Sequence, residues 1–296
     1  MHRNKYQVIV PFLVPSAVIY IIFVIYPYIS AMYTSLTVWN GYSPTKKFVG
    51  LYNFEQLVQD HHFWGALEHN IIFLITLPLI TLSIALFFAF LFTQVRRSDR
   101  FYALSQVYRV TYFFPQVMSA VAIAVLWSFV FHPTIGILNS ALHLIGISGP
   151  TWLGDPHTSL IAILIVSVWS AVGFYMILFI AGMQSIPGDY YEAARIDGAG
   201  GWSIFWSVTW PLLWDHTRAA LIFICISAMD MFTLTQVLTA GGPNNSSDVL
   251  ATFLYRSAFQ NSQFGYATAI GVALFVITMV ISGILFQIGR RERLEY

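Results

Sequence analysis

Residues 70–93 read NIIFLITLPLITLSIALFFAFLFT, and none of these side chains carries a formal charge. A helix of this length crosses the hydrocarbon core of a bilayer, which needs about 20 mostly apolar residues. Apolar stretches of similar length lie on both sides of this one along the chain. The sequence therefore predicts an all-α polytopic membrane protein with six transmembrane helices, at about residues 7–30, 70–93, 112–131, 159–181, 217–238 and 267–288.

The composition excludes most other classes of protein. Of 296 residues, 57% are apolar, 17% are aromatic and only 9% are charged, and the mean hydropathy is +0.70. About a quarter of the residues in a soluble domain are charged, so a soluble globular protein is excluded. Cys225 is the only cysteine, which excludes an intramolecular disulfide and a cysteine-based metal cluster. The eight histidines lack the spacing and the supporting carboxylate of zinc-binding helices, so we predict no metal site.

The basic residues predict the orientation of the helices. Lys46, Lys47 and Arg256 fall on one side of the predicted spans, and the other 11 of the 14 lysines and arginines fall on the side of both termini. Because cytoplasmic loops carry the excess of basic residues, both termini are predicted to be cytoplasmic. The first span also has features of a signal peptide. Its length and its lack of a small-residue cleavage site favour an uncleaved helix.

The predicted cytoplasmic loop 182–216 contains start and stop signals for a helix. Asp189, followed by Glu192 three residues later, matches a capping box at a helix N-terminus. Asp197-Gly198 ends this short helix, because glycine supplies the positive φ of a helix stop. We therefore expect a short, capped helix in this loop.

A second short helix, at about residues 202–210, leads back into the membrane, and two interpretations of the loop stay open. In the first, it is an interfacial helix with a glycine hinge. In the second, a protruding helix–turn–helix docks into a cytoplasmic partner, and the small side chains of Ala193 and Ala194 permit a close approach.

The order of residues in this loop resembles the EAA loop of the permease subunits of binding-protein-dependent ABC importers. The family pattern is Glu-Ala-Ala, three residues, Gly, nine residues, and Ile-x-Leu-Pro. Here Glu192-Ala193-Ala194 is followed by Gly198 and by Val208-Thr209-Trp210-Pro211 at the same spacing. Val208 and Trp210 replace the isoleucine and the leucine of the pattern.

A second motif narrows the family. Leu238-Thr239-Ala240-Gly241-Gly242-Pro243 resembles a Leu-Thr-x-Gly-Gly-Pro stretch of sugar-type permeases, such as the larger subunit of maltose importers and the corresponding subunit of glycerol-3-phosphate importers. The resemblance implies the ABC importer type I permease fold. It implies that residues 1–296 form a single transmembrane permease domain, with residues 182–216 as its coupling loop. It also implies a multi-pass protein of a bacterial or archaeal cytoplasmic membrane.

The resemblance also implies a set of partners. In the family, the permease pairs with a second homologous permease, two ATP-binding cassette subunits hydrolyse ATP, and an external solute-binding protein delivers the sugar, with no nucleic acid involved. This chain contains no Gly-x-x-x-x-Gly-Lys-[Ser/Thr] phosphate loop. We therefore expect ATP and Mg²⁺ on the partner subunits, and no cofactor and no enzymatic activity here. The residues expected to couple to the ATPase are Glu192, Ala193, Ala194, Arg195, Asp197 and Gly198.

Asp230 is the one formal charge well inside a predicted span, near the middle of the fifth helix. A carboxylate at the bilayer centre costs roughly 2.5–3.5 kcal/mol on insertion scales, so it is a functional candidate by default. Its oxygens accept hydrogen bonds from sugar hydroxyls, and Ser227 and Thr233 lie three residues to either side on a similar face. The alternative is a protonated Asp230 that is hydrogen-bonded between helices.

The fourth span adds weaker candidates for the substrate pathway. Ser170 and Tyr175 are polar, and Trp169 is expected to stack on the C–H faces of a sugar. Residues of this kind also occur at ordinary helix–helix contacts in membranes, which is the alternative interpretation.

Two other functions compete with that of an ATP-driven importer. An ion-gradient-driven secondary carrier often shows inverted repeats, but no internal repeat is evident, and the loop 182–216 would have no role in it. A membrane-embedded enzyme would need clustered His, Asp or Glu side chains, and Asp230 has no obvious chemical partner.

Overall fold

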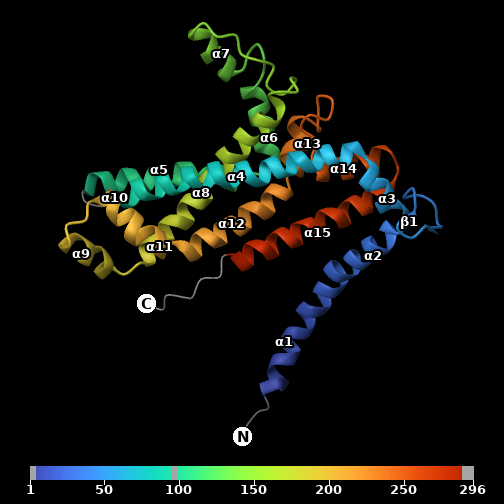
Figure 1. Ribbon diagram of the computed structural model, residues 1–296, viewed down its shortest axis with the longest axis horizontal. Coiled ribbons are helices and arrows are strands. Elements are labelled where there is room, and N and C mark those ends of the chain that lie inside the picture. The colour runs from blue at the N-terminus through green and yellow to red at the C-terminus, as the bar shows by residue number, and fades with distance from the viewer. Residues whose placement is uncertain (1–4, 95–98, 289–296) are drawn as a thin grey trace. The chain divides into compact units, whose positions relative to one another are not determined.

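The computed structural model describes residues 5–94 and 99–288, which are helical over most of their length (Figure 1). The chain divides into two compact units. The first unit contains the described residues up to Trp64 together with Phe253–Val276, and the second contains Gly65–Thr252 together with the described residues from Ile277 onward. We describe each unit by itself.

The first unit begins with a long apolar helix. Residues Ile9–Ser35 run as one candidate membrane span although Pro11 and Pro15 lie inside it, and none of its most apolar window is buried. A two-residue antiparallel ladder follows, in which Thr37 pairs with Phe48. The elements are α1 (Lys5–Tyr20), the π-helical turn η1 (Ile21–Ile25), α2 (Tyr26–Ser35), β1 (Thr37–Val38), β2 (Lys47–Phe48), α3 (Tyr52–Gln59), the start of α4 (His61–Gln94), the second half of α14 (Leu250–Tyr255), η4 (Arg256–Gln260) and the first half of α15 (Phe264–Ile288).

A buried amide and a glycine hold this unit together. The Asn53 side chain is buried and donates hydrogen bonds to the carbonyl oxygens of Ser35, at 2.7 Å, and Thr37, at 2.9 Å. A Cβ atom at Gly265 would overlap the carbonyl oxygen of Thr37, and the Gly265 N–H donates to Trp39 O at 3.1 Å. Glycine is therefore required where α15 begins, because the backbone of the β1 segment lies against it.

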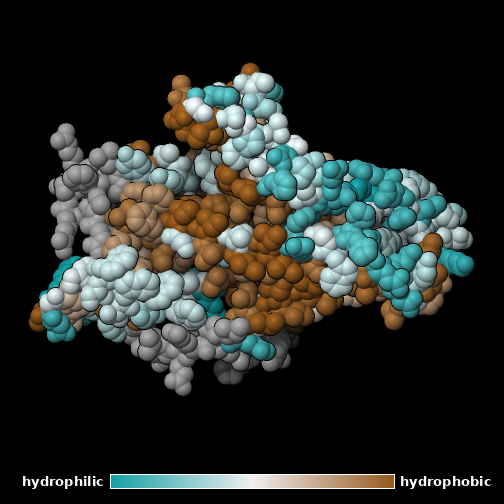
Figure 2. Space-filling model, turned by 45° about the horizontal axis from the view of Figure 1, so that its top comes forward, coloured by the Kyte–Doolittle hydropathy of each residue, from teal (hydrophilic) through white to brown (hydrophobic). Residues whose placement is uncertain are grey.

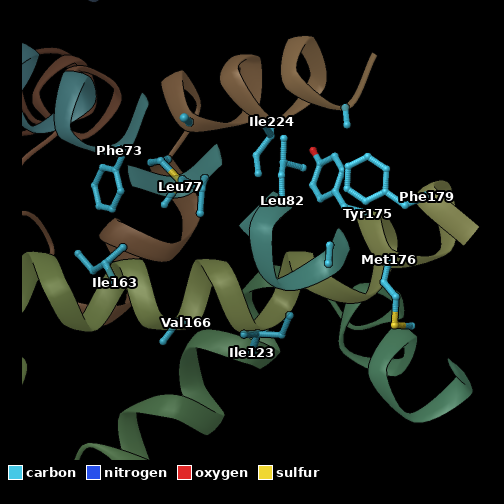
Figure 3. Close-up of a cluster of buried hydrophobic side chains, with 14 of the residues drawn as sticks. Phe73, Leu77, Leu82, Ile123, Ile163, Val166, Tyr175, Met176, Phe179 and Ile224 are labelled. Atoms are coloured by element: carbon cyan, nitrogen blue, oxygen red, sulfur yellow. The ribbon is translucent and has the colours of Figure 1, made fainter. Parts of the chain in front are cut away.

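The second unit is built around α8. More than half of the most apolar window of this helix is buried, and the core packs on it from several sides. Figure 3 shows Phe73 and Leu77 of α4, Ile163 of α8 and Ile224 of α12 among these buried side chains. The elements are the rest of α4, α5 (Asp99–Val117), α6 (Ala120–Val130), α7 (Ile137–Leu144), α8 (Ser159–Ser185), α9 (Gly188–Ile196), α10 (Gly201–Ile204), the π-helical η3 (Phe205–Thr209), α11 (Trp210–Leu212), α12 (Trp214–Met229), α13 (Phe232–Leu238) and the first residues of α14.

The predicted third span, 112–131, is wrong as a single straight helix. Its residues belong to α5 and α6, which are bent by 103° relative to each other. The Ser119 side chain accepts a hydrogen bond from the Ala122 N–H at 3.2 Å and so caps the start of α6. On the α5 side, a Cβ atom at Gly173 of α8 would overlap the carbonyl oxygen of Tyr112, so the close packing of α5 on α8 requires glycine.

The predicted fifth span, 217–238, is also wrong as a continuous helix. α12 ends at Met229, and α13 starts at Phe232 and packs against α6. The membrane-spanning pair on the N-terminal side of this break is Gly201–Leu212 with Trp214–Met229, bent by 67°. The break falls at Asp230, the residue singled out from the sequence.

The described residues agree with a protein that crosses a membrane six times. Four helices are long and apolar enough to span a bilayer, and the two bent pairs bring the number to six when each pair counts as one span. Large apolar side chains are exposed throughout, with Phe12 at 78% and Phe23 at 72%, and Figure 2 shows hydrophobic side chains over much of the visible surface. A soluble monomer rarely exposes large contiguous apolar patches, so this surface is the one that faces lipid or other subunits.

Candidate coupling and transport sites

The helix α9 carries the residues expected to reach the ATPase, and it begins differently from the prediction. Its N-cap is Pro187, with φ −56° and ψ 140°, and no side chain caps it. Asp189 lies inside the first turn, so the predicted capping box of Asp189 and Glu192 is wrong. Proline fixes the φ that precedes the first turn, and Asp189 then stabilises the helix through the positive end of the helix dipole.

The end of α9 confirms the predicted glycine stop. Gly198 has φ +79°. Its N–H donates to Arg195 O at 3.0 Å, and the Ala199 N–H donates to Ala194 O at 2.9 Å. These two bonds form a Schellman motif, which needs a left-handed residue that glycine adopts without a Cβ penalty.

Most of the surface of α9 is exposed, and only Tyr191 and Ala194 are half-buried. None of its residues is buried. Glu192 and Arg195 are exposed, and within the described residues neither side chain takes part in an ion pair or a side-chain hydrogen bond. Glu192 and Arg195 therefore do not pair with each other, and both charges are available to an external partner. Ala193 and Asp197 are also exposed, whereas Ala194 is half-buried.

The base of α9 is stiff. The predicted second short helix is present as α10, η3 and α11, and Ile204 and Phe205 anchor it in the core. Phe90 of α4 packs on Phe205 at 5.0 Å between ring centroids, and Trp202 stacks on Phe205 at 5.6 Å. The Thr209 hydroxyl donates to the Tyr191 hydroxyl oxygen at 3.5 Å, which ties η3 to α9. These contacts connect α9, through η3, to Phe90 of α4.

Asp230 does not lie inside a helix. It follows the last residue of α12, with φ −102° and ψ 61°, and it is exposed. Its backbone N–H donates to the carbonyl oxygens of Ile226, at 3.3 Å, and Ser227, at 3.1 Å. Its carboxylate has no hydrogen-bond partner within the described residues, so the alternative of an Asp230 bonded to another helix of this chain is not what the structure shows.

Asn70, which was not among the residues predicted from the sequence, hydrogen-bonds to the backbone at this break. Asn70 of α4 is fully buried, and its Nδ2 donates to Ala228 O and Met229 O, both at 3.3 Å. Its Oδ1 accepts a hydrogen bond from the Leu250 N–H at 2.9 Å. The only available signal was that Asn70 is a lone amide at the edge of the apolar stretch 70–93.

The three hydroxyl-bearing residues predicted for the substrate pathway differ in their burial and in the helices that carry them. Ser227 is exposed on α12 and donates to Phe223 O at 3.0 Å, and Ser170 is half-buried on α8 and donates to Ser167 O at 2.9 Å. Both hydroxyls therefore bond to their own helix backbone but can still accept. Thr233 is half-buried on α13. Because α12 and α13 are separate helices, Ser227 and Thr233 do not share one continuous helix face.

The two aromatic candidates of α8 also differ. Trp169 is 39% exposed and packs edge-on against Trp127 of α6, with ring centroids 5.5 Å apart. Tyr175 is 5% exposed and lies in the apolar core beside Phe179 (Figure 3). The structure thus leaves Trp169 accessible and brings it to α6, whereas Tyr175 is covered by other helices.

The Leu-Thr-Ala-Gly-Gly-Pro motif begins at the end of α13 and continues into a hydrogen-bonded segment, called here the 239–252 loop, which includes the first three residues of α14. The Thr239 and Ser247 hydroxyl oxygens are 2.8 Å apart. The Thr252 hydroxyl donates to the Asp248 carboxylate at 2.5 Å. Gly241 has φ +85°, and a Cβ atom there would crowd that carboxylate. The motif therefore has a structural role in making this loop rigid.

The 239–252 loop also ties two helices of the second unit together. Ser246 and Ser159 at the start of α8 have hydroxyl oxygens 3.0 Å apart. His69 of α4 has its Nδ1 2.7 Å from Asp248 O. The loop thus joins the helix that follows the break to α4 and α8.

Comparison with known proteins finds membrane components of transport systems. Residues 67–294 match the family described as "Binding-protein-dependent transport system inner membrane component". The diacetylchitobiose uptake system permease protein of Streptomyces coelicolor is 38% identical over 284 residues, which cover 94% of this chain and 80% of that protein. The trehalose/maltose transport system permease protein of Thermococcus litoralis is 30% identical over 281 residues, with 95% and 93% covered.

A solved structure has the same fold. A chain of a bacterial ABC transporter involved in the import of the acidic polysaccharide alginate superposes with a TM-score of 0.86 at 22% identity, covering 98% of this chain and 97% of that one. At this identity the likeness concerns the fold alone.

Proposed function

This chain belongs to the family of binding-protein-dependent transport system inner membrane components, and we propose that it forms half of the pathway through which a sugar is imported. It is a multi-pass permease subunit of a sugar-type ABC importer and a transport component rather than an enzyme. The observation that carries the proposal is the exposed Asp230 at a break in a membrane helix.

The substrate side of the proposal rests on the chemistry of this break. An exposed carboxylate accepts hydrogen bonds from the hydroxyls of a sugar, and Ser227 on α12 and Thr233 on α13 add oxygens before and after it. Trp169 offers an accessible ring for the C–H face of the sugar. The cargo is a mono-, di- or oligosaccharide, in keeping with the diacetylchitobiose and the trehalose/maltose named for the relatives.

The proposed coupling to ATP hydrolysis depends on α9. We infer that an ATP-binding cassette subunit receives this helix in a cleft, with Glu192, Arg195 and Asp197 making ion pairs across the interface and Ala193 allowing close contact. Two such subunits bind ATP and Mg²⁺, one for this chain and one for a second homologous permease. An external binding protein delivers the sugar, and both termini lie in the cytoplasm.

The test of the pathway is uptake by the assembled importer carrying Asp230→Ala. We expect at least about a tenfold loss of the maximal uptake rate, the scale of a lost charged hydrogen bond, while the binding protein captures sugar normally. Asp215→Ala, an exposed acid in the first turn of the same α12, is the matched control and should transport normally. Unchanged uptake by Asp230→Ala would remove this residue from the pathway.

A further inference from the structure

The break at Asp230 leaves two backbone carbonyl groups in need of partners. In an unbroken α-helix, the oxygens of Ala228 and Met229 would accept hydrogen bonds from the N–H groups four residues ahead, at Phe232 and Thr233. Those residues belong instead to α13. Ala228 and Met229 are both buried, so water does not reach them freely. A buried carbonyl group without a partner costs free energy, so the break would be less stable without donors from another part of the chain.

Asn70 supplies the missing donors from another helix. A primary amide has two N–H groups and one oxygen, and Asn70 directs its Nδ2 to both carbonyl oxygens and its oxygen to the Leu250 N–H. No other uncharged side chain of this size offers two donors and an acceptor together. An aspartate would keep the acceptor and lose both N–H donors, and a leucine would lose all three bonds.

The neighbouring residue on α4 reinforces this contact. His69 bonds to Asp248 O and Asn70 bonds to the Leu250 N–H, so two consecutive side chains of α4 hold the end of the 239–252 loop. That loop is itself made rigid by the bonds of Thr252 and Ser247. The amide of Asn70 therefore holds the helix break against a rigid frame.

We propose that Asn70 is a positioning residue that holds the break between α12 and α13 and thereby sets where Asp230 presents its carboxylate. The structural half of this proposal depends only on the hydrogen bonds above. The transport half rests on the proposed function, in which Asp230 contacts the sugar.

The structural half is tested by hydrogen–deuterium exchange of the assembled importer. In Asn70→Leu, we expect the peptides covering 226–234 and 248–254 both to exchange faster. In Asn70→Asp, the 226–234 peptide should exchange at least about tenfold faster, because buried carbonyl groups lose their donors, while the 248–254 peptide keeps its acceptor and stays protected. Unchanged exchange at 226–234 in both variants would overturn the proposal.

Two controls separate this effect from general loss of stability. Asn53→Asp removes the same kind of buried amide from the first unit, where it donates to two carbonyl oxygens, and it should leave exchange at 226–234 unchanged. Thr81→Val removes, on the same α4, a fully buried hydroxyl that has no hydrogen-bond partner among residues 5–94 and 99–288, and it should also leave that exchange unchanged. Equal acceleration at 226–234 in either control would contradict a specific role for Asn70.

The transport half is tested by uptake kinetics with Asp230 intact. We expect Asn70→Asp to lower the maximal uptake rate at least about tenfold, without changing the half-saturating concentration of sugar-loaded binding protein, and Asn70→Gln to restore part of the rate. Accelerated exchange together with normal uptake would overturn the transport half, whereas the pathway role of Asp230 is decided separately by the uptake of Asp230→Ala. Accelerated exchange with reduced uptake would support both.

Discussion

At the scale of single residues, glycines act in two physically different ways in this protein. Gly198 is needed for its backbone angle, because its φ is +79° and nothing lies within 4 Å of the position of a Cβ atom. Gly173 and Gly265 are needed for space, because a Cβ atom at either would overlap a backbone carbonyl oxygen. Only the first kind leaves a sequence signal, since it stands directly after a short helix.

The angle of Gly198 leads to a test of coupling. Side chains other than glycine are disfavoured in the left-handed region, asparagine and aspartate least, so Gly198→Asp adds both strain and a negative charge at the end of α9. We expect ATP-driven uptake in vesicles to be lost, with ATP hydrolysis uncoupled from transport or assembly prevented. Gly200→Asp is the matched control, because Gly200 has φ −74° and equally open space. Normal uptake by Gly198→Asp would contradict the coupling role of this turn.

At the scale of elements, two of the predicted membrane helices are bent or broken, and the causes differ. The bend between α5 and α6 has a local cause, since Ser119 caps the new helix with its own side chain. The break after α12 has no such cap, and a side chain from α4 satisfies its backbone. The first kind can be recognised in a sequence, and the second cannot.

The cap at Ser119 makes a prediction about stability. Loss of a serine N-cap costs about 0.5–2 kcal/mol, so Ser119→Ala should lower the thermal unfolding temperature of the purified importer. Ser128→Ala is the control on the same helix, because the Ser128 hydroxyl is half-buried and donates back to Val125 O at 2.7 Å rather than capping a helix end. If Ser119→Ala and Ser128→Ala both unfolded at the same temperature as the unaltered protein, Ser119 would have no capping role.

At the scale of the whole molecule, the exposed apolar surface and the few charges carry different information. The apolar helices place the chain in a membrane, and the distribution of basic residues predicts the direction in which it crosses. Lys47 lies in β2 of the first unit and Gly200 lies beside α9 in the second. The two positions are therefore predicted on opposite sides of the bilayer.

Cysteine labelling tests this orientation. In a background where Cys225 is replaced by alanine, a membrane-impermeant thiol reagent should modify Lys47→Cys in spheroplasts. The same reagent should modify Gly200→Cys only after the membrane is permeabilised. Lys47 and Gly200 are both exposed and lie outside the candidate spans. The outcome therefore depends on which side of the membrane the reagent reaches and not on burial of the residue. The reverse pattern would place the termini outside.

The amino-acid sequence by itself determined the features that depend on local composition and local backbone angles. Six apolar stretches follow from side-chain hydropathy alone, and the stop of α9 at Gly198 follows from the conformational freedom of glycine. The predicted N-cap of α9 is wrong. Both Pro187 and Asp189 are common at helix starts, and only the backbone conformation shows that Pro187 is the N-cap.

Only the tertiary structure decided that the predicted fifth helix is broken at Asp230. The segment around Asp230 contains neither proline nor glycine, and its composition favours an unbroken helix. The break is stable because Asn70, 158 positions earlier than Ala228 in the chain, supplies the donors that the helix has lost. Hydrogen bonds between residues so far apart leave no periodic pattern in a sequence, so the exposure of Asp230 could be recognised only once α4, α12 and the 239–252 loop were seen packed together.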